Sequence, residues 1–292
     1  MRERDVREGA VRDTADGAPA VYLIHGLLGT GYGHFGRQIS AWRGRYRVVP
    51  VDLPGHGRCP LDAEEDYFDG ALRYLVALLD RFGPGRLIGA SYLGGPLAHR
   101  CAATRPDLVS SLVLTGFAPG IGKDAFLALI AGFDRLAADQ PALAAEYERL
   151  HTARWKQTLA AVTGHVGRDF ERTALVRWED LAASGTPTLI LNGSLKSAER
   201  AAAERAEETG AETGEETGAK TGEETGAKTG AETSARRGDR GHRGGLLRGQ
   251  VIEGAGHLVG HDMPEAFIEA VEAFWGIRDF RGFSQRSGRD SE

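Results

Sequence analysis

The stretch Ile88-Gly89-Ala90-Ser91-Tyr92-Leu93-Gly94-Gly95 places a serine among small residues, between a short apolar run and a helical pattern. The apolar run predicts a strand over residues 86–89, and the pattern after it predicts a helix over residues 96–104. Small residues beside a serine at a strand-to-helix turn let the backbone bend sharply and project the hydroxyl above a sheet. The free N–H groups and the dipole of a helix start also favour a developing negative charge. The pattern therefore makes Ser91 a candidate nucleophile.

Strand and helix patterns alternate on both sides of this turn. Helical spacing of apolar residues predicts helices over residues 67–82 and 266–275. Short apolar runs predict further strands over residues 20–24, 45–51, 108–114, 186–191 and 249–253. This alternation predicts an α/β fold in which helices flank both faces of a mostly parallel central sheet. We expect one such domain to occupy the whole chain, residues 1–292.

Two segments interrupt the alternation. Residues 118–182 are rich in Ala, Leu, Arg and Glu with apolar side chains at helical intervals, which predicts a helical cap of two to four helices over the carboxyl edge of the sheet. From Thr209 to Thr233 the dipeptide Thr-Gly returns every four residues. Each glycine costs a helix about 1 kcal/mol, and no apolar side chain offsets the ordering entropy. Residues 207–245 are therefore expected to be a disordered low-complexity insertion, a repeat expansion that folding tolerates rather than a partner-binding tether.

Charge and composition exclude several classes of function. The formal net charge of −5 gives no electrostatic case for nucleic-acid binding, and the apolar runs are far too short to cross a membrane. The first residues hold no apolar signal segment, which predicts a cytoplasmic protein with free structural thiols at Cys59 and Cys101. The sequence holds no group of metal ligands and no phosphate-binding loop, so neither a metal nor a cofactor is expected.

Three further motifs occur at defined places relative to the predicted strands and helices. They are His25-Gly26-Leu27-Leu28-Gly29 after the first strand, Asp52-Leu53-Pro54-Gly55-His56-Gly57 after the second, and Gly254-Ala255-Gly256-His257 before the last helix. With these motifs the chain resembles the α/β-hydrolase superfamily, over about residues 19–205 and 246–276. The resemblance implies an α/β-hydrolase fold with Ser91 at the nucleophile elbow and His257 as the catalytic base. It also implies an oxyanion hole formed by the backbone N–H groups of Leu27 and Tyr92.

The other histidines and the aromatic residues of residues 118–182 carry weaker signals. His25 and His56 fall in the structural loops of the family, and His261 is expected at the surface. No motif supports a role for His34, His99, His151, His165 or His242. Candidates for lining an acyl pocket, with helix packing as the default for each, are Phe126, Phe133, Tyr147, Trp155 and Phe170.

Two positions depart from the family pattern. The elbow usually reads G-x-S-x-G, but here Leu93 stands in the last position and the glycine follows at Gly94. The triad acid usually follows the strand predicted over residues 186–191, about three residues after a glycine. That glycine is Gly193, and Lys196 stands at the expected position. A lysine cannot accept a hydrogen bond from the histidine N–H.

Three hypotheses address the missing acid. Glu199 is the tentative acid if a small shift of the loop brings its carboxylate to His257, although an acidic residue is also simply favoured at a helix start. Asp124, eight residues beyond Gly116, is a second candidate. In the third hypothesis there is no acid, and the protein is a weak serine–histidine dyad or does not catalyse.

Two functions follow from these patterns. The first is a serine hydrolase that cleaves a small carboxylic ester or thioester, with transfer to an acceptor other than water and carbon–carbon bond hydrolysis left open. The second is a non-catalytic or ligand-binding member of the same fold, which Leu93, Lys196 and the repeat favour. The expected partner is a small acyl substrate, and neither its acyl length nor the oligomeric state is specified by the sequence.

Overall fold

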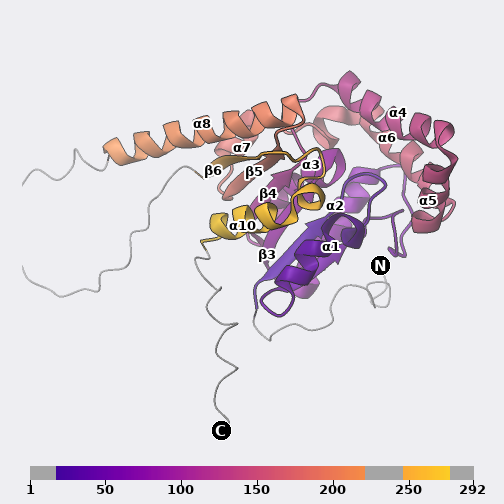
Figure 1. Ribbon diagram of the computed structural model, residues 1–292, viewed down its shortest axis with the longest axis horizontal. Coiled ribbons are helices and arrows are strands. Elements are labelled where there is room, and N and C mark those ends of the chain that lie inside the picture. Colours follow the sequence, from indigo (N-terminus) through magenta and orange to yellow (C-terminus); the bar gives the residue numbers. More distant parts are fainter. Residues whose placement is uncertain (1–17, 221–245, 277–292) are drawn as a thin grey trace, which may run out of the picture.

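A six-stranded parallel sheet forms the centre of the protein (Figure 1). The computed structural model describes residues 18–220 and 246–276. The strands lie in the order β2-β1-β3-β4-β5-β6, and each neighbouring pair is parallel. Their bounds are β1 Ala20–Ile24, β2 Arg47–Val51, β3 Gly85–Ala90, β4 Val109–Thr115, β5 Thr188–Gly193 and β6 Leu247–Ile252. The predicted α/β fold with a parallel central sheet is confirmed.

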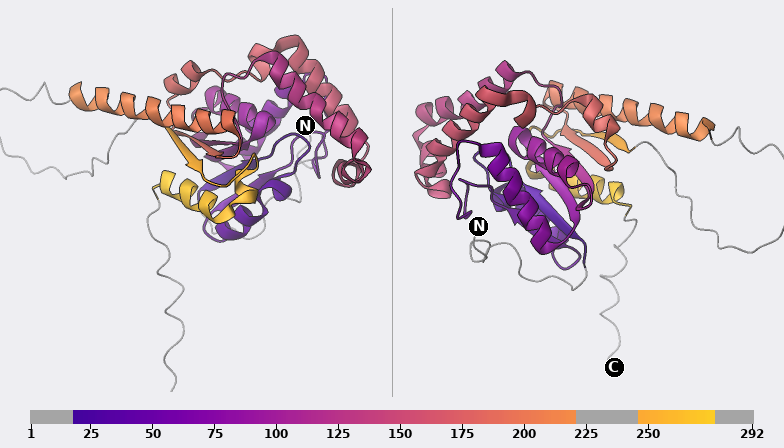
Figure 2. Two further views of the ribbon diagram at one scale, coloured as in Figure 1. Left: turned by 45° about the horizontal axis from the view of Figure 1, so that its top comes forward. Right: turned by 180° about the vertical axis from the view of Figure 1, so that it is seen from behind.

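Helices pack on both faces of the sheet, as Figure 2 shows. Alternate side chains of each strand point to opposite faces, so β1 contributes Tyr22 to one core and Leu23 to the other. The first core lies under α2, α3 and α8, and the second under α1, α9 and α10. These helices are α1 Gly31–Trp42, α2 Tyr67–Phe82, α3 Ser91–Thr104, α8 Ser197–Lys220, α9 Val259–Asp262 and α10 Pro264–Phe274. Burial on both faces explains why β1 reads as a continuous apolar run, whereas the edge strand β6, Leu247–Ile252, contains exposed polar residues.

The chain forms four helices between β4 and β5. They are α4 Lys123–Asp139, α5 Pro141–His151, α6 Arg154–Thr173 and α7 Trp178–Ala183. Three of them, α4, α5 and α6, lie together beside the carboxyl edge of the sheet, and the short α7 lies near α8 (Figure 1). Helices α4 and α6 pack against each other through Phe126 and Phe170, whose ring centroids are 5.8 Å apart. Helices α4–α7 are together called the cap.

Helix α8 contradicts part of the prediction that residues 207–245 are disordered. It runs from Ser197 to Lys220, so residues 207–220 are helical where disorder was expected, and residues 221–245 lie outside the described residues. The helix begins before the repeat, and its first half is packed, since Ala203 and Ala206 are fully buried against the sheet. Once nucleation has been overcome, each added residue contributes another hydrogen bond, so scattered glycines do not stop propagation. The prediction counted the destabilising glycines but not the stabilising burial of the first half of the helix.

Two further observations concern the described residues as a whole. None of their helices is long and apolar enough to cross a membrane. Cys59 and Cys101 are both buried free thiols, far apart in the sequence and without a disulfide.

Candidate active site

The serine turn joins β3 to α3 without an intervening loop. Ser91 is the first residue of α3 and has a positive φ of 61°, which is a strained conformation for a residue with a side chain. Helix α3 thus begins earlier than predicted, because Pro96 lies inside the helix instead of starting it. The tight turn lifts the Ser91 hydroxyl above the carboxyl edge of the sheet, as the small residues around it had indicated.

Gly94 takes over the close contact that the displaced elbow glycine usually makes. A Cβ atom at Gly94 would lie 2.5 Å from the carbonyl oxygen of Ile24 and 2.7 Å from that of His25. Leu93, in contrast, is 2% exposed, belongs to the core and lines the pocket. The close backbone contact is therefore made one residue later, at Gly94 instead of position 93, and it is not lost.

This contact gives a stability prediction. Gly94→Ala should lower the free energy of unfolding by about 3 kcal/mol, because its Cβ meets two backbone oxygens that cannot move aside. Gly36→Ala is the matched control, since a Cβ at Gly36 would meet nothing within 4 Å. Urea denaturation of both variants measures the difference. Equal stability of the two variants would show that β1 yields to the added methyl group.

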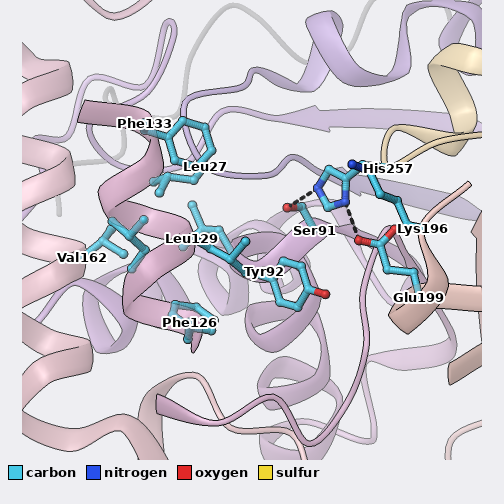
Figure 3. A pocket seen from close by; sticks show the side chains of 12 residues that line it. Leu27, Ser91, Tyr92, Phe126, Leu129, Phe133, Val162, Lys196, Glu199 and His257 are labelled. Atoms are coloured by element: carbon cyan, nitrogen blue, oxygen red, sulfur yellow. Dashed lines mark hydrogen bonds and ion pairs between the residues drawn. The ribbon is translucent and has the colours of Figure 1, made fainter. Parts of the chain in front are cut away.

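Three side chains from distant parts of the chain form a hydrogen-bonded line above the sheet (Figure 3). The Nε2 atom of His257 lies 2.9 Å from Ser91 Oγ, and its Nδ1 atom lies 2.7 Å from Glu199 Oε1. The Glu199 side chain is only 7% exposed. A carboxylate that accepts from Nδ1–H leaves Nε2 free to accept the hydroxyl proton of Ser91. The three groups thus have the contacts that a nucleophile, a base and an acid require.

Asn192, which the sequence reasoning did not single out, fixes the position of Glu199. Its Nδ2 donates to the carbonyl oxygens of Glu199 at 2.7 Å and of Phe117 at 2.8 Å, while Oδ1 accepts from the Phe117 N–H at 3.1 Å. Asn192 is fully buried near the end of β5. A single amide in the apolar run Leu189-Ile190-Leu191-Asn192 was the signal that could have revealed it.

The other two positions considered for the acid do not reach His257. Lys196 lines the same pocket as Glu199 but has an exposed side chain. Asp124 is exposed in the first turn of α4 and does not line the pocket. Of the sequence candidates, only Glu199 contacts the histidine.

Residues 25–29, here called the oxyanion loop, surround the N–H group of Leu27. The neighbouring peptide groups all have imidazole partners: Gly26 N–H donates to His34, and Leu28 N–H donates to His56. His151 of the cap donates to the Leu28 carbonyl oxygen at 3.0 Å. Leu27 N–H itself has no hydrogen-bond partner in the described part of the chain. Leu27 and Tyr92 line the same pocket, and the Tyr92 N–H is in the first turn of α3, where it has no intrahelical partner.

The histidines around the oxyanion loop are neutral. Burial lowers the pKa of His25 to about 4 and that of His56 well below its ordinary value. Burial likewise lowers the pKa of His34, to about 3, and that of His151. Each ring accepts a hydrogen bond from a backbone N–H group, which a protonated imidazole cannot do. His34 and His151 therefore have structural roles that no motif in the sequence indicated.

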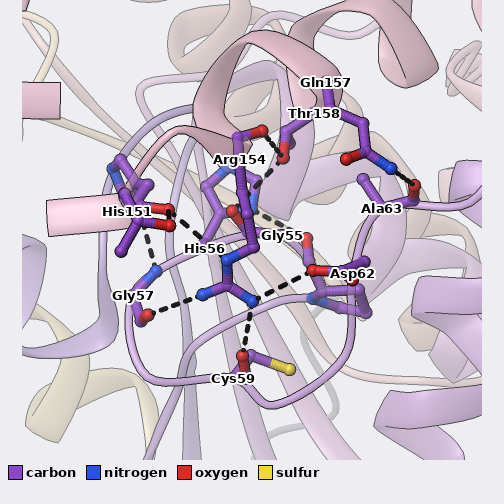
Figure 4. A network of polar contacts seen from close by, with 12 residues as sticks. Gly55, His56, Gly57, Cys59, Asp62, Ala63, His151, Arg154, Gln157 and Thr158 are labelled. Atoms are coloured by element: carbon purple, nitrogen blue, oxygen red, sulfur yellow. Dashed lines mark hydrogen bonds and ion pairs between the residues drawn. The ribbon is translucent and has the colours of Figure 1, made fainter. Parts of the chain in front are cut away.

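The cap is fastened to the loop that follows β2 by several polar contacts (Figure 4). His151 Nδ1 accepts from Gly57 N–H at 2.9 Å, and Arg154 donates to the carbonyl oxygens of Gly57 and Cys59 at 3.1 and 3.0 Å. Gln157 and Thr158 add bonds to the carbonyl oxygens of residues 63 and 55. The base of the cap and the oxyanion loop therefore share one hydrogen-bonded frame.

A pocket of about 350 Å³ opens beside Ser91 (Figure 3). Its apolar part comes from the cap residues Phe126, Leu129, Ile130, Phe133 and Val162 with Leu27, Tyr92 and Leu93. Its polar part comes from Ser91, Lys196, Glu199 and His257. The pocket therefore includes Phe126 and Phe133 of the aromatic candidates, whereas Tyr147, Trp155 and Phe170 are buried elsewhere in the cap. No group of three His, Cys, Asp or Glu residues that could hold a metal ion occurs in residues 18–220 and 246–276.

Comparisons with known proteins agree with the fold. The family model described as alpha/beta hydrolase family matches residues 21–270. The pimeloyl-[acyl-carrier protein] methyl ester esterase of Neisseria meningitidis is 30% identical over 207 residues, which cover 68% of this chain and 73% of that protein. The crystal structure of NosK from Streptomyces actuosus is 66% identical, with a TM-score of 0.75 over 89% of this chain and 98% of that one. An esterase structure from Thermogutta terrifontis, 19% identical with a TM-score of 0.59 over 88% and 89% of the two chains, shares the fold alone. This protein belongs to the alpha/beta hydrolase family.

Proposed function

We propose that the protein is a serine hydrolase that cleaves a small carboxylic ester or thioester through an acyl-enzyme on Ser91. The line of hydrogen bonds from Ser91 Oγ through His257 to Glu199 Oε1 is the observation that carries this proposal. The curated relative from Neisseria meningitidis is itself named an ester esterase, which supports the ester class. The mostly apolar pocket beside Ser91 supports an apolar acyl group.

The reaction has two halves. In the first, Ser91 Oγ attacks the carbonyl carbon while His257 Nε2 takes the hydroxyl proton. The tetrahedral oxyanion is held by the N–H groups of Leu27 and Tyr92, each worth about 3 kcal/mol in well-studied enzymes. His257 then gives its proton to the leaving oxygen or sulfur, and the acyl group remains on Ser91. In the second half, His257 takes a proton from water, the hydroxide attacks the acyl-enzyme, and the acid is released as Ser91 regains its proton.

Glu199 stabilises the imidazolium that forms in both halves. Its carboxylate faces His257 Nδ1 from a buried position, so the attraction is screened less than it is between surface charges. The alternative of a non-catalytic protein draws on Leu93, on the repeat and on Lys196 at the place expected for the acid. The contact of the Glu199 carboxylate with His257 supports the catalytic proposal over this alternative.

A fluorophosphonate probe tests the proposal, because it phosphonylates only a serine whose hydroxyl is activated by a base. We expect stoichiometric labelling of the wild-type protein and none of Ser91→Ala or His257→Ala. Ser40→Ala is the control, because Ser40 is exposed on α1 away from the pocket, and it should label like the wild type. A folded wild-type sample that does not label would leave the ligand-binding alternative.

A further inference from the structure

The pocket carries its charge at one end only. Figure 3 shows Lys196 and Glu199 on the far side of His257, while Phe126, Phe133 and Val162 lie on the other side of Ser91. Among the residues that line the pocket, Lys196 is the only lysine or arginine. A substrate in this pocket therefore meets an ammonium group at one end and an apolar surface at the other.

Among residues 18–220 and 246–276, no group pairs with the charge of Lys196. Within the described residues, no carboxylate lies within ion-pair distance of its ammonium group. The nearby Glu199 carboxylate is engaged by His257 at 2.7 Å instead. The backbone of Lys196 is held at the start of α8, where its carbonyl oxygen accepts from Arg200 N–H at 2.8 Å. The backbone of Lys196 is thus held in place, and its ammonium group is available to bind a ligand.

The chemistry of the proposed reaction decides which part of the substrate meets Lys196. His257 must deliver its proton to the leaving atom, so the leaving group lies on the His257 side of Ser91. The acyl group then occupies the apolar end. A cation on the His257 side also disfavours the imidazolium that forms during the reaction, and an anion on the leaving group cancels this repulsion.

We infer that Lys196 binds an anionic group, a carboxylate or a phosphate, on the leaving group of the substrate. This inference rests on the proposed function and narrows its substrate class to an apolar acyl group joined to an anionic alcohol or thiol. Lys196 would be a specificity-determining residue that touches the substrate without taking part in proton transfer.

Binding to the Ser91→Ala protein tests the inference without any turnover. The probes are the hexanoyl thioesters of mercaptoacetate and of mercaptoacetamide, which differ in one charge at nearly equal size. At low salt we expect the anionic thioester to bind about fivefold more tightly, the upper range for a solvent-exposed ion pair. Lys196→Met should abolish the preference, Lys196→Arg should keep it, and the exposed cap variant Lys156→Met should not change it. Isothermal titration calorimetry gives the affinities.

Failure of this inference is distinguishable from failure of the proposed function. Equal affinities for the two thioesters, weak binding of both, or a preference that survives in Lys196→Met would overturn the role of Lys196. Turnover of both thioesters at equal rates by the wild-type protein would support the hydrolase and overturn only the anion preference. A Lys196-dependent preference in a protein that neither labels nor turns over would support the binding subsite and overturn the hydrolase.

Discussion

Glu199→Gln is expected to lower kcat by about ten-thousand-fold without unfolding the protein. The carboxamide has the size of the carboxylate, but its NH₂ group can donate to His257 Nδ1 and so select the tautomer with the proton on Nε2. That tautomer cannot accept the Ser91 proton. The corresponding change of aspartate to asparagine in a serine protease costs about this factor.

The measurement is steady-state hydrolysis of a para-nitrophenyl ester, together with the rate of fluorophosphonate labelling. Glu204→Gln is the matched control, because Glu204 lies on the same helix but is exposed and pairs with Arg200. Both variants should show the same thermal unfolding midpoint to within a few degrees. A kcat of Glu199→Gln within tenfold of the wild type would mean that another group orients His257, or that the pair works as a dyad.

Acidification is expected to destabilise the fold well before the carboxylates titrate. The pKa of His25 is lowered from 6.5 to about 4 and that of His34 to about 3, in each case mainly by burial. Between pH 6.5 and 4 the unfolded chain therefore binds more protons than the folded chain, so stability falls as the pH falls. The two histidines together should lower the free energy of unfolding by about 4 kcal/mol between pH 6.5 and 4.5. His56 and His151 act in the same direction.

Urea denaturation at a series of pH values measures this slope. His34→Gln should flatten this slope, because it removes a neutral imidazole whose pKa is lowered to about 3 mainly by burial. Stability that stays constant from pH 7 to pH 4.5 would contradict the picture of a neutral histidine cluster around the oxyanion loop.

The fold and two of the three aligned side chains could be predicted from local sequence. The sharp turn at Ser91 needs small residues on both sides, and strand burial needs continuous apolar runs, so both leave a mark within a few residues. The glycine that lies before His257 marks its loop in the same way. No single motif contains both Ser91 and His257. Their contact was predicted from the order of the four motifs, which is the order found in the α/β-hydrolase superfamily.

The acid could not be chosen from sequence, because its place depends on how α8 packs. Asn192 holds the backbone of Glu199, and α8 lies very close to β6, where a Cβ at Gly249 would be less than 2 Å from the Ala203 carbonyl oxygen. That approach joins residues more than forty positions apart. The contact of His151 with Leu28 depends in the same way on the docking of the cap. Tertiary packing of this kind leaves no periodic signal in the chain.

The shared frame of the cap and the oxyanion loop has a consequence for how substrate enters. Displacing the base of α5 and α6 would break the bonds of His151, Arg154 and Thr158 together, at about 1 kcal/mol each, and would release the Leu28 carbonyl oxygen. Rigid-body opening of the cap would thus disturb the proposed oxyanion hole at Leu27 each time it occurred. Leu129 lines the pocket and is also 44% exposed, so rotation of its side chain would widen the pocket without moving a helix. Access by such nanosecond motions would keep the catalytic frame intact through every turnover.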